Sequence, residues 1–354
     1  TFHDALVPFA ERRIIKMKKM SRRVQVYLSL LAIVVLIMSG CGQMERLEMQ
    51  NDNNRIRIVC TIFPQYDWVL NLIKGNEENI SLTLLMDKGG DLHNFQPSAL
   101  DIAKVSDCDL FIYVGGESDT WVDDALEEAV NPNMRVINMM EAIQTDLVEE
   151  EHLEGFKEHT HPGEAHEAHE HAYDEHVWLS LRNTEHIVAV IANELAALDD
   201  ENTVLYQNNF DAYAMQLKAL DERYREAVQC GQTDTLLFAD RFPFRYLMED
   251  YDLNYYAAFD GCSAETEASF ETVAFLVNKM DELGLGAALV IDGSDERLAQ
   301  VIIENTKDRN QQILILNSLQ AVSRKDMQSG LSYLSAMEEN LKALELALNS
   351  KITD

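Results

Sequence analysis

Short apolar runs alternate with longer stretches of mixed polarity along residues 55–354. In the first half, runs rich in β-branched or apolar residues occupy 56–63, 80–86, 109–116 and 135–139. In the second half, similar runs occupy 235–240, 253–259, 287–293 and 312–318. Strands that are apolar on both faces and separated by helix-like stretches are typical of a parallel sheet covered on both sides. The pattern therefore predicts an α/β fold built from two similar units.

A long amphipathic segment lies between the two halves. Neither Pro nor Gly interrupts residues 203–229, and Gly231 follows where a helix would end. The apolar residues recur at steps of three and four: Phe210, Tyr213, Leu217, Leu220, Tyr224 and Val228. At ~1.5 Å per residue such a helix spans roughly 40 Å. We also expect a shorter helix over Thr184–Leu198, with Asn183 as its N-cap.

These elements divide the chain into lobes. We predict an N-terminal α/β lobe at 55–202, a linking helix at 203–230 and a C-terminal α/β lobe at 231–354. Both sheets are expected to be parallel, and open α/β sheets bind ligands outside the carboxyl ends of their strands. The predicted ligand site is thus the cleft between the lobes.

Residues 1–40 have the pattern of upstream residues followed by an export signal. Five basic residues between 16 and 23 precede a 15-residue apolar run, Val24–Met38, which is short for a transmembrane helix of ~20 residues. The following Ser-Gly-Cys ends at Cys41 and resembles the bacterial lipobox. That resemblance implies cleavage before Cys41 and attachment of a lipid to its sulfur, with an uncleaved anchor helix as the alternative. Residues 41–54 are expected to be a tether.

The charge is strongly negative and unevenly distributed. The formal net charge is −32, with +5 on residues 1–40 and −37 on residues 41–354. Nucleic-acid partners need a basic surface, so we expect none. In an exported chain Cys60, Cys108, Cys230 and Cys262 could form disulfides, but free thiols fit equally well. We expect the protein to act as a monomer.

Candidate metal ligands follow several of the predicted strands. His93 follows the second strand, and His176 stands between a His-rich loop and the apolar run VWLSL. Asp240 and Asp292 end the first and third strands of the second half, and Glu296 follows in the next turn. A single loop His is usually just solvated. Two imidazoles and several carboxylates at one cleft, however, form a plausible site for a divalent ion.

Five stretches together resemble the solute-binding lipoproteins of zinc and manganese ABC importers. They are TIFPQYDW (61–68), GGDLHNFQPSALD (89–101), the His-rich loop, DEHVWL (174–179) and RFPFRYL (241–247). The resemblance covers about residues 55–350. It implies two Rossmann-like lobes bridged by one rigid helix. It also implies capture of a divalent metal outside the membrane and delivery of that metal to an ABC permease.

The resemblance also assigns metal ligands, with two departures in this chain. His93 and His176 match the first two ligands, and Glu175 stands where the family usually has Pro. The third ligand is His in zinc members and Glu in manganese members. Here the position is Arg241, whose guanidinium stays protonated and cannot donate a lone pair.

Acidic residues of the second half are the expected replacements. We expect Asp240 to substitute for the missing third ligand. The family's fourth carboxylate falls close to Glu296, with Asp292 as the nearby alternative. Arg241 would otherwise neutralise these carboxylates.

The loop at 149–175 bears on the identity of the metal. It contains His152, His159, His161, His166, His169 and His171 among many Glu residues. Imidazoles collect Zn²⁺ loosely and carboxylates concentrate cations, although an inert solvated tract is the alternative. The resemblance associates such loops with zinc members, whereas two His with carboxylates tolerate Mn²⁺ better than three His do.

The sequence therefore predicts an extracytoplasmic Zn²⁺-binding lipoprotein on the bacterial cell membrane. A manganese-binding member, or a metal-binding surface adhesin or storage lipoprotein, is the alternative. The two His of HEAH (166–169) are three residues apart, not the four of the H-E-x-x-H metalloprotease motif. No other catalytic motif was found, so we expect no enzyme.

Overall fold

The computed structural model describes residues 55–149, 173–259, 261 and 268–352. Residues 56–354 are grouped as one compact unit, so the lobe boundaries at 202 and 231 stay a prediction. The apolar run at 24–38, Cys41 and the tether lie outside the described residues. Among the residues described, no helix is both long enough and apolar enough to cross a membrane.

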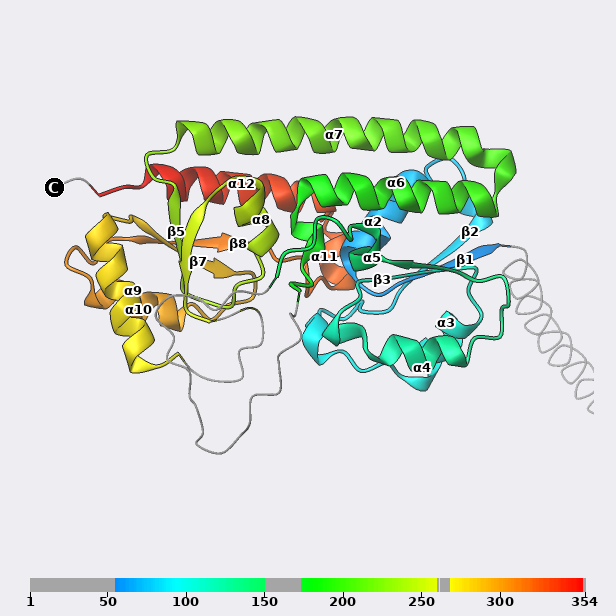
Figure 1. Ribbon diagram of the computed structural model, residues 1–354, viewed down its shortest axis with the longest axis horizontal. Coiled ribbons are helices and arrows are strands. Elements are labelled where there is room, and N and C mark those ends of the chain that lie inside the picture. The colour runs from blue at the N-terminus through cyan, green and yellow to red at the C-terminus, as the bar shows by residue number, and fades with distance from the viewer. Residues whose placement is uncertain (1–54, 150–172, 260, 262–267, 353–354) are drawn as a thin grey trace, which may run out of the picture. The chain divides into compact units, whose positions relative to one another are not determined.

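Two four-stranded parallel sheets form the framework (Figure 1). The first contains β1 (Ile56–Cys60), β2 (Ile80–Leu84), β3 (Leu110–Tyr113) and β4 (Arg135–Asn138), in the order β2-β1-β3-β4. The second contains β5 (Thr235–Phe238), β6 (Asn254–Ala257), β7 (Ala287–Ile291) and β8 (Gln312–Leu316), in the order β6-β5-β7-β8. All eight strands fall inside the predicted runs, and the equivalent strand orders confirm the repeated α/β unit.

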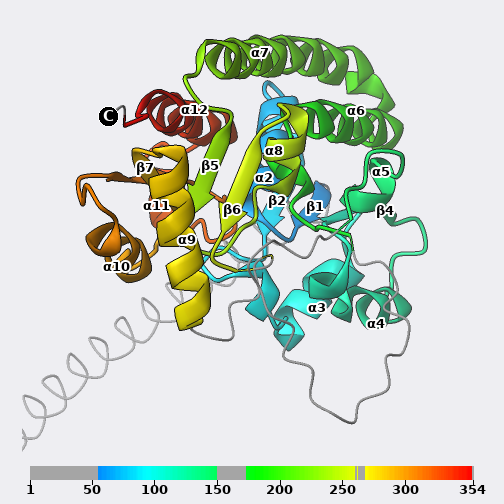
Figure 2. The ribbon, with the colours of Figure 1, turned by 60° about the vertical axis from the view of Figure 1, so that its left-hand side comes forward.

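Helices cover both faces of each sheet. They are α2 (Phe63–Leu72), α3 (Ala99–Ser106), α4 (Trp121–Glu127), α5 (Met139–Ala142), α6 (Leu181–Leu198), α7 (Thr203–Cys230), α8 (Arg245–Asp250), α9 (Phe270–Leu283), α10 (Arg297–Asn305), α11 (Arg324–Gln328) and α12 (Tyr333–Asn349). Figures 1 and 2 show α6 and α12 between α7 and the sheets, with α3 and α4 on the other side of the first sheet and α9 and α10 beside the second.

The long helix α7 confirms the predicted linking helix. It has 28 residues and packs against α6, α2 and α12. Tyr213, Leu217, Leu220 and Tyr224, four members of the predicted apolar stripe, are buried. Because α7 contacts elements from both ends of the chain, it joins the two sheets into one framework.

One hydrophobic core continues from the first half of the chain to the last. Its members include Ile58 and Trp68, Tyr224 of α7, and Leu289 and Leu344 from the C-terminal half. Smaller clusters lie beside α9 and α10 and beside α3 and α4. A shared core opposes independent movement of the two sheets, because separating them would expose apolar surface.

The start of α6 differs from the prediction. The helix begins at Leu181, and Ser180 is its N-cap, with its hydroxyl accepting the backbone N–H of Asn183 at 3.0 Å. The prediction of Asn183 as the cap was therefore wrong. The buried residues 177–179 form a short 3₁₀ turn, which places Ser180 where its side chain reaches that N–H.

Buried hydrogen bonds connect this turn to the second half of the chain. Trp178 donates from Nε1 to the carbonyl oxygen of Ser318 at 2.9 Å, and the Tyr333 hydroxyl donates to the carbonyl of Trp178 at 2.7 Å. The backbone N–H of Tyr333 donates to Oδ2 of Asp67 at 3.1 Å. These contacts hold the turn next to His176 against residues of the second half.

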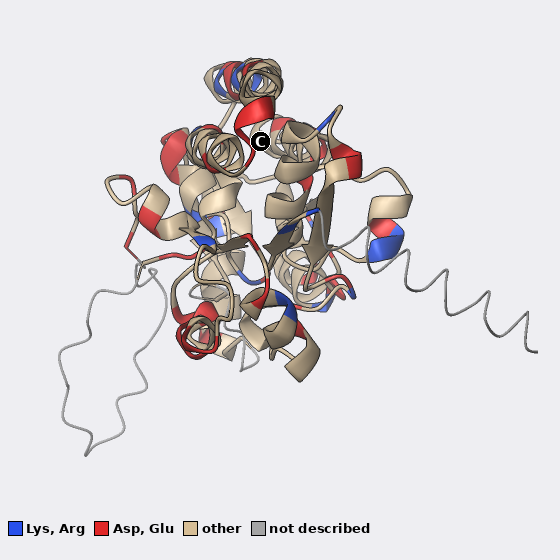
Figure 3. Cartoon of the chain, turned by 90° about the vertical axis from the view of Figure 1, so that its right-hand side faces the viewer, with Lys and Arg blue, Asp and Glu red and all other residues tan. Residues whose placement is uncertain are grey.

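In the part of the chain that the structure covers, Cys60, Cys108 and Cys230 are unpaired. Burial raises the pKa of the Cys108 thiol to about 12, so it is unreactive at neutral pH. Figure 3 shows acidic positions spread over many helices with basic ones between them.

Candidate metal-binding site

His93 lies on the loop that follows β2, in a short 3₁₀ turn at Leu92–Asn94. Asp91 precedes this turn, and its Oδ1 accepts the backbone N–H of His93 at 3.1 Å. Leu92 is fully buried and anchors the turn in the core. The Nδ1 atom of His93 lies 2.9 Å from the hydroxyl of Ser118, so its Nε2 atom is the one left to bind another group.

His176 lies just before the 3₁₀ turn at Val177–Leu179 and is almost fully buried. One oxygen of Asp174, Oδ1, accepts the backbone N–H of His176 at 2.8 Å and also lies 2.9 Å from its Nδ1. The Asp174 carbonyl in turn accepts the hydroxyl of Tyr246 at 2.9 Å. These contacts fix the ring and direct Nε2 away from Asp174.

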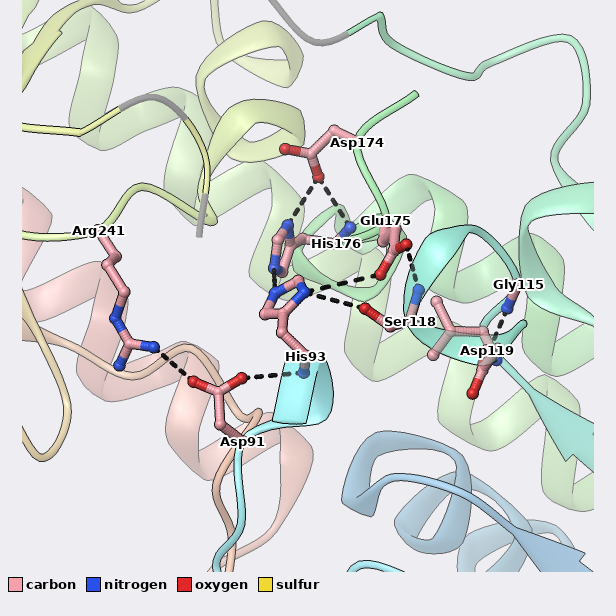
Figure 4. A network of polar contacts seen from close by, with 10 residues as sticks. Asp91, His93, Gly115, Ser118, Asp119, Asp174, Glu175, His176 and Arg241 are labelled. Atoms are coloured by element: carbon pink, nitrogen blue, oxygen red, sulfur yellow. Dashed lines mark hydrogen bonds and ion pairs between the residues drawn. The ribbon is translucent and has the colours of Figure 1, made fainter. Parts of the chain in front are cut away.

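The two imidazoles meet through their Nε2 atoms, which are 3.3 Å apart (Figure 4). Two nitrogens bound to one tetrahedral Zn²⁺ at ~2.0–2.1 Å are separated by about 3.3–3.4 Å. Both Nδ1 atoms have acceptors nearby, so each Nε2 can present a lone pair. Facing lone pairs at this distance repel unless a proton or a cation lies between them. The pair is therefore suited to holding a cation.

A second group of residues lies behind His93. Glu175 is 7% exposed, and its Oε1 accepts the backbone N–H of Ser118 at 2.8 Å. Its other oxygen, Oε2, is 3.9 Å from Nδ1 of His93. Ser118 itself belongs to a 3₁₀ turn at Glu117–Asp119 that follows β3. The loops after β2 and β3 and the residues before α6 thus combine at one edge of the first sheet.

Asp119 stabilises the turn that carries Ser118. Its Oδ2 accepts the backbone N–H groups of Val114 at 2.8 Å and Gly115 at 3.0 Å. Burial raises the pKa of the Asp119 carboxyl to about 6, although these two hydrogen bonds act in the opposite direction. Asp119 thus connects the turn to the residues that follow β3.

Arg241, which occupies the expected position of a third ligand, contacts the first half of the chain. Its guanidinium forms an ion pair with Oδ2 of Asp91, whose other oxygen holds the backbone of His93. Asp91 therefore connects Arg241 to the His93 turn.

The predicted carboxylates of the second half have other contacts. Oδ1 of Asp240 accepts the backbone N–H of Arg241 at 2.8 Å. Oδ1 of Asp292 accepts both the backbone N–H and the hydroxyl of Ser318, at 2.7 and 2.9 Å. Glu296 precedes α10 and has a left-handed backbone, with φ of 58°.

These positions do not identify a third metal ligand. Over the described ranges, no group of three or more His, Cys, Asp or Glu side chains is placed to hold one metal ion. The structure thus brings the two predicted His together but does not bring Asp240, Asp292 or Glu296 into a cluster with them. The loop histidines, His152, His159, His161, His166, His169 and His171, lie outside the described residues.

Sequence reasoning missed the residues that orient the two rings. Asp91 and Asp174 each precede a His by two positions and each accept that His backbone N–H. The repeated D-x-H pattern was visible in the sequence, so a search for Asp two residues before each candidate ligand would have found them. Ser118 had no such signal, because only the folded sheet brings it to His93.

Comparison with known proteins gives consistent results. Residues 58–347 match the model of the ZnuA family, described as zinc-uptake complex component A, periplasmic. The zinc-binding protein AdcA of Streptococcus pyogenes serotype M3 is 27% identical over 296 residues, which cover 82% of this chain and 56% of AdcA. The chain thus spans little more than half the length of that relative.

Two further matches cover nearly the whole of the compared protein. The high-affinity zinc uptake system protein ZnuA of Bacillus subtilis is 27% identical over 322 residues, 91% of this chain and 97% of that protein. The crystal structure of the Zn(II)-bound ZnuA-like domain of Streptococcus pneumoniae AdcA superposes with a TM-score of 0.65 at 25% identity. That match covers 83% of this chain and 99% of the domain.

Proposed function

The chain belongs to the ZnuA family of zinc-uptake components, and from this premise we propose that it captures Zn²⁺ outside the cytoplasmic membrane and delivers it to an ABC-importer permease. The observation that carries the proposal is the 3.3 Å separation between the Nε2 atoms of His93 and His176. Each ring is oriented through its Nδ1, as is usual for metal-binding His. The cation is the cargo of the site, so a site that binds it and later releases it needs no catalytic group.

His93 and His176 are the proposed zinc ligands from the first half of the chain. A carboxylate from the second half would complete the set, with Asp240 as the first candidate and Glu296 or Asp292 as alternatives. Zinc accepts oxygen ligands at ~2.0–2.2 Å, so the chosen carboxylate must approach the His pair when the ion binds. Because the two sheets share one core, such a movement would be confined to the loops that follow the strands of the second sheet.

The remaining parts of the proposal come from the sequence. A lipid on Cys41 would hold the protein at the outer face of the membrane. The six loop histidines at 152–171 would collect zinc weakly and pass it to the fixed pair. The permease is the proposed partner, and zinc, not manganese, is the proposed cargo.

Calorimetric titration of the purified protein with Zn²⁺ tests this proposal. We expect one tight site per chain, which His93→Ala and His176→Ala should each remove, because one imidazole alone binds zinc weakly. His186→Ala is the matched control, since His186 lies exposed on α6. Deletion of residues 150–172 should remove weak binding and keep the tight site. Unchanged tight binding in both His93→Ala and His176→Ala would refute the assignment, and preference for Mn²⁺ in competition would refute the choice of cargo.

A further inference from the structure

Two consecutive carboxylates, Asp174 and Glu175, face two different imidazoles (Figure 4). Asp174 lies 2.9 Å from Nδ1 of His176, and Oε2 of Glu175 lies 3.9 Å from Nδ1 of His93. The two rings come from positions 83 residues apart in the chain. One dipeptide therefore places a carboxylate beside the Nδ1 atom of each proposed zinc ligand.

The position of Glu175 is built into the fold. Its Oε1 accepts the Ser118 N–H at 2.8 Å. Oε2 is buried without a hydrogen-bond partner among the described residues. Burying a carboxylate oxygen in this way is costly unless a charge or a donor compensates. Nδ1 of His93 is within ion-pair distance of this oxygen.

Gly116 provides the space that Glu175 occupies. A Cβ atom at position 116 would lie 2.5 Å from Oε1 of Glu175. The Gly116 backbone has φ of 78° and ψ of −162°, a region that is essentially restricted to glycine. The turn after β3 therefore approaches Glu175 more closely than any side chain would allow.

We propose that Glu175 is a positioning residue for His93, and that Asp174 and Glu175 together balance the charge of a divalent ion held between the two rings. This inference rests on the proposed zinc-binding function. The Asp91 carboxylate is paired with Arg241, whereas the carboxylates of Asp174 and Glu175 lie beside the Nδ1 atoms of the two rings. A carboxylate behind a ligand His fixes the ring and strengthens its donor nitrogen, and losing such a partner typically costs 10- to 100-fold in metal affinity.

Glu175→Gln separates this role from a purely structural one. Gln keeps an amide oxygen that can accept the Ser118 N–H, but it removes the negative charge that lies 3.9 Å from Nδ1 of His93. We expect Zn²⁺ affinity to fall about 10- to 100-fold, with faster release of zinc to a chelator in stopped-flow measurements. Glu117→Gln is the matched control, because it removes the same charge from an exposed residue of the neighbouring turn and should leave affinity unchanged.

A second readout follows the proton on His93 directly. In the zinc-loaded wild-type protein, NMR of ¹⁵N-labelled His should show the Nδ1 proton of His93 downfield and slow to exchange with solvent. In Glu175→Gln this resonance should move upfield and exchange faster while the Nδ1 proton of His176, which faces Asp174 at 2.9 Å, stays unchanged, whereas a folding defect would alter both. The wild-type spectrum tests the inference even if the variant folds poorly, since a fast-exchanging proton there would overturn it.

The results distinguish the inference from the function on which it rests. If the wild-type protein binds zinc tightly and His93→Ala abolishes that binding, the proposed function stands. Wild-type affinity and release rate in Glu175→Gln would then overturn the role of Glu175 alone. If His93→Ala and His176→Ala both bind zinc as tightly as the wild type, the proposed function fails first.

Discussion

Gly116→Ala is a sharp test of the geometry behind the His pair. The substitution adds one methyl group at a position where the backbone has φ of 78° and where a Cβ would lie 2.5 Å from Oε1 of Glu175. That atom accepts the backbone N–H of Ser118 at 2.8 Å. The methyl group must therefore displace Glu175, change the turn, or both.

The magnitude follows from two contributions. Holding alanine in a glycine-only region costs about 1–3 kcal/mol. Loss of a hydrogen bond to a charged acceptor costs about 1.5–3 kcal/mol. We therefore expect Gly116→Ala to lower the free energy of unfolding by about 2.5–6 kcal/mol. Zinc affinity should fall as well, because Glu175 would no longer lie against His93.

Urea unfolding of three variants isolates each contribution. Gly90 has no positive φ, and no atom lies within 4 Å of the position that a Cβ would take there, so Gly90→Ala should be nearly neutral. Gly293 has the same φ of 78° as Gly116 but open space around its Cβ position, so Gly293→Ala reports the cost of a positive φ without a close contact. If Gly116→Ala is no less stable than Gly293→Ala and binds zinc like the wild type, the close packing of Glu175 against Gly116 is refuted.

Two further predictions concern stability and metal choice. Burial raises the pKa of the Asp67 carboxyl to about 6, above its value of ~3.9 in the unfolded chain. The folded protein therefore keeps a proton that the unfolded chain releases. The stability that this proton contributes is lost as the pH rises from about 4 to 6. Relative to the wild type, the free energy of unfolding of Asp67→Asn should therefore rise by up to about 3 kcal/mol between pH 4 and pH 7, as measured by urea unfolding. A difference between the two proteins that does not change with pH would contradict this. Arg241→His should tighten zinc binding about tenfold or more, because an imidazole can donate the lone pair that a guanidinium lacks. Arg241→Gln is its control in Zn²⁺/Mn²⁺ competition, and equal affinities for the two variants would place position 241 away from the ion.

Much of the fold could be predicted because local patterns determine it. Each strand lies in a short run rich in apolar and β-branched residues, and α7 has an apolar stripe at helical spacing with glycine at its end. The start of α6 was the exception, because Ser180 and Asn183 are both good caps. The choice between them depended on the buried turn at 177–179.

The site could be predicted only in part. His93 and His176 stood out by their motifs, and the structure places their Nε2 atoms 3.3 Å apart. The ion pair of Arg241 with Asp91 and the contact of Glu175 with Ser118 join segments separated by 150 and 57 residues. No local pattern encodes such contacts, because they depend on which loops meet at the edges of the two sheets.

The sequence by itself determined the repeated α/β units, the linking helix and the two candidate imidazoles, since periodicity and residue chemistry act over a few neighbouring positions. Tertiary structure alone decided that the two Nε2 atoms face each other, that Asp174 and Glu175 serve different rings, and that Arg241 is held by Asp91. These outcomes depend on strand order and loop packing, which bring together atoms that the chain keeps far apart.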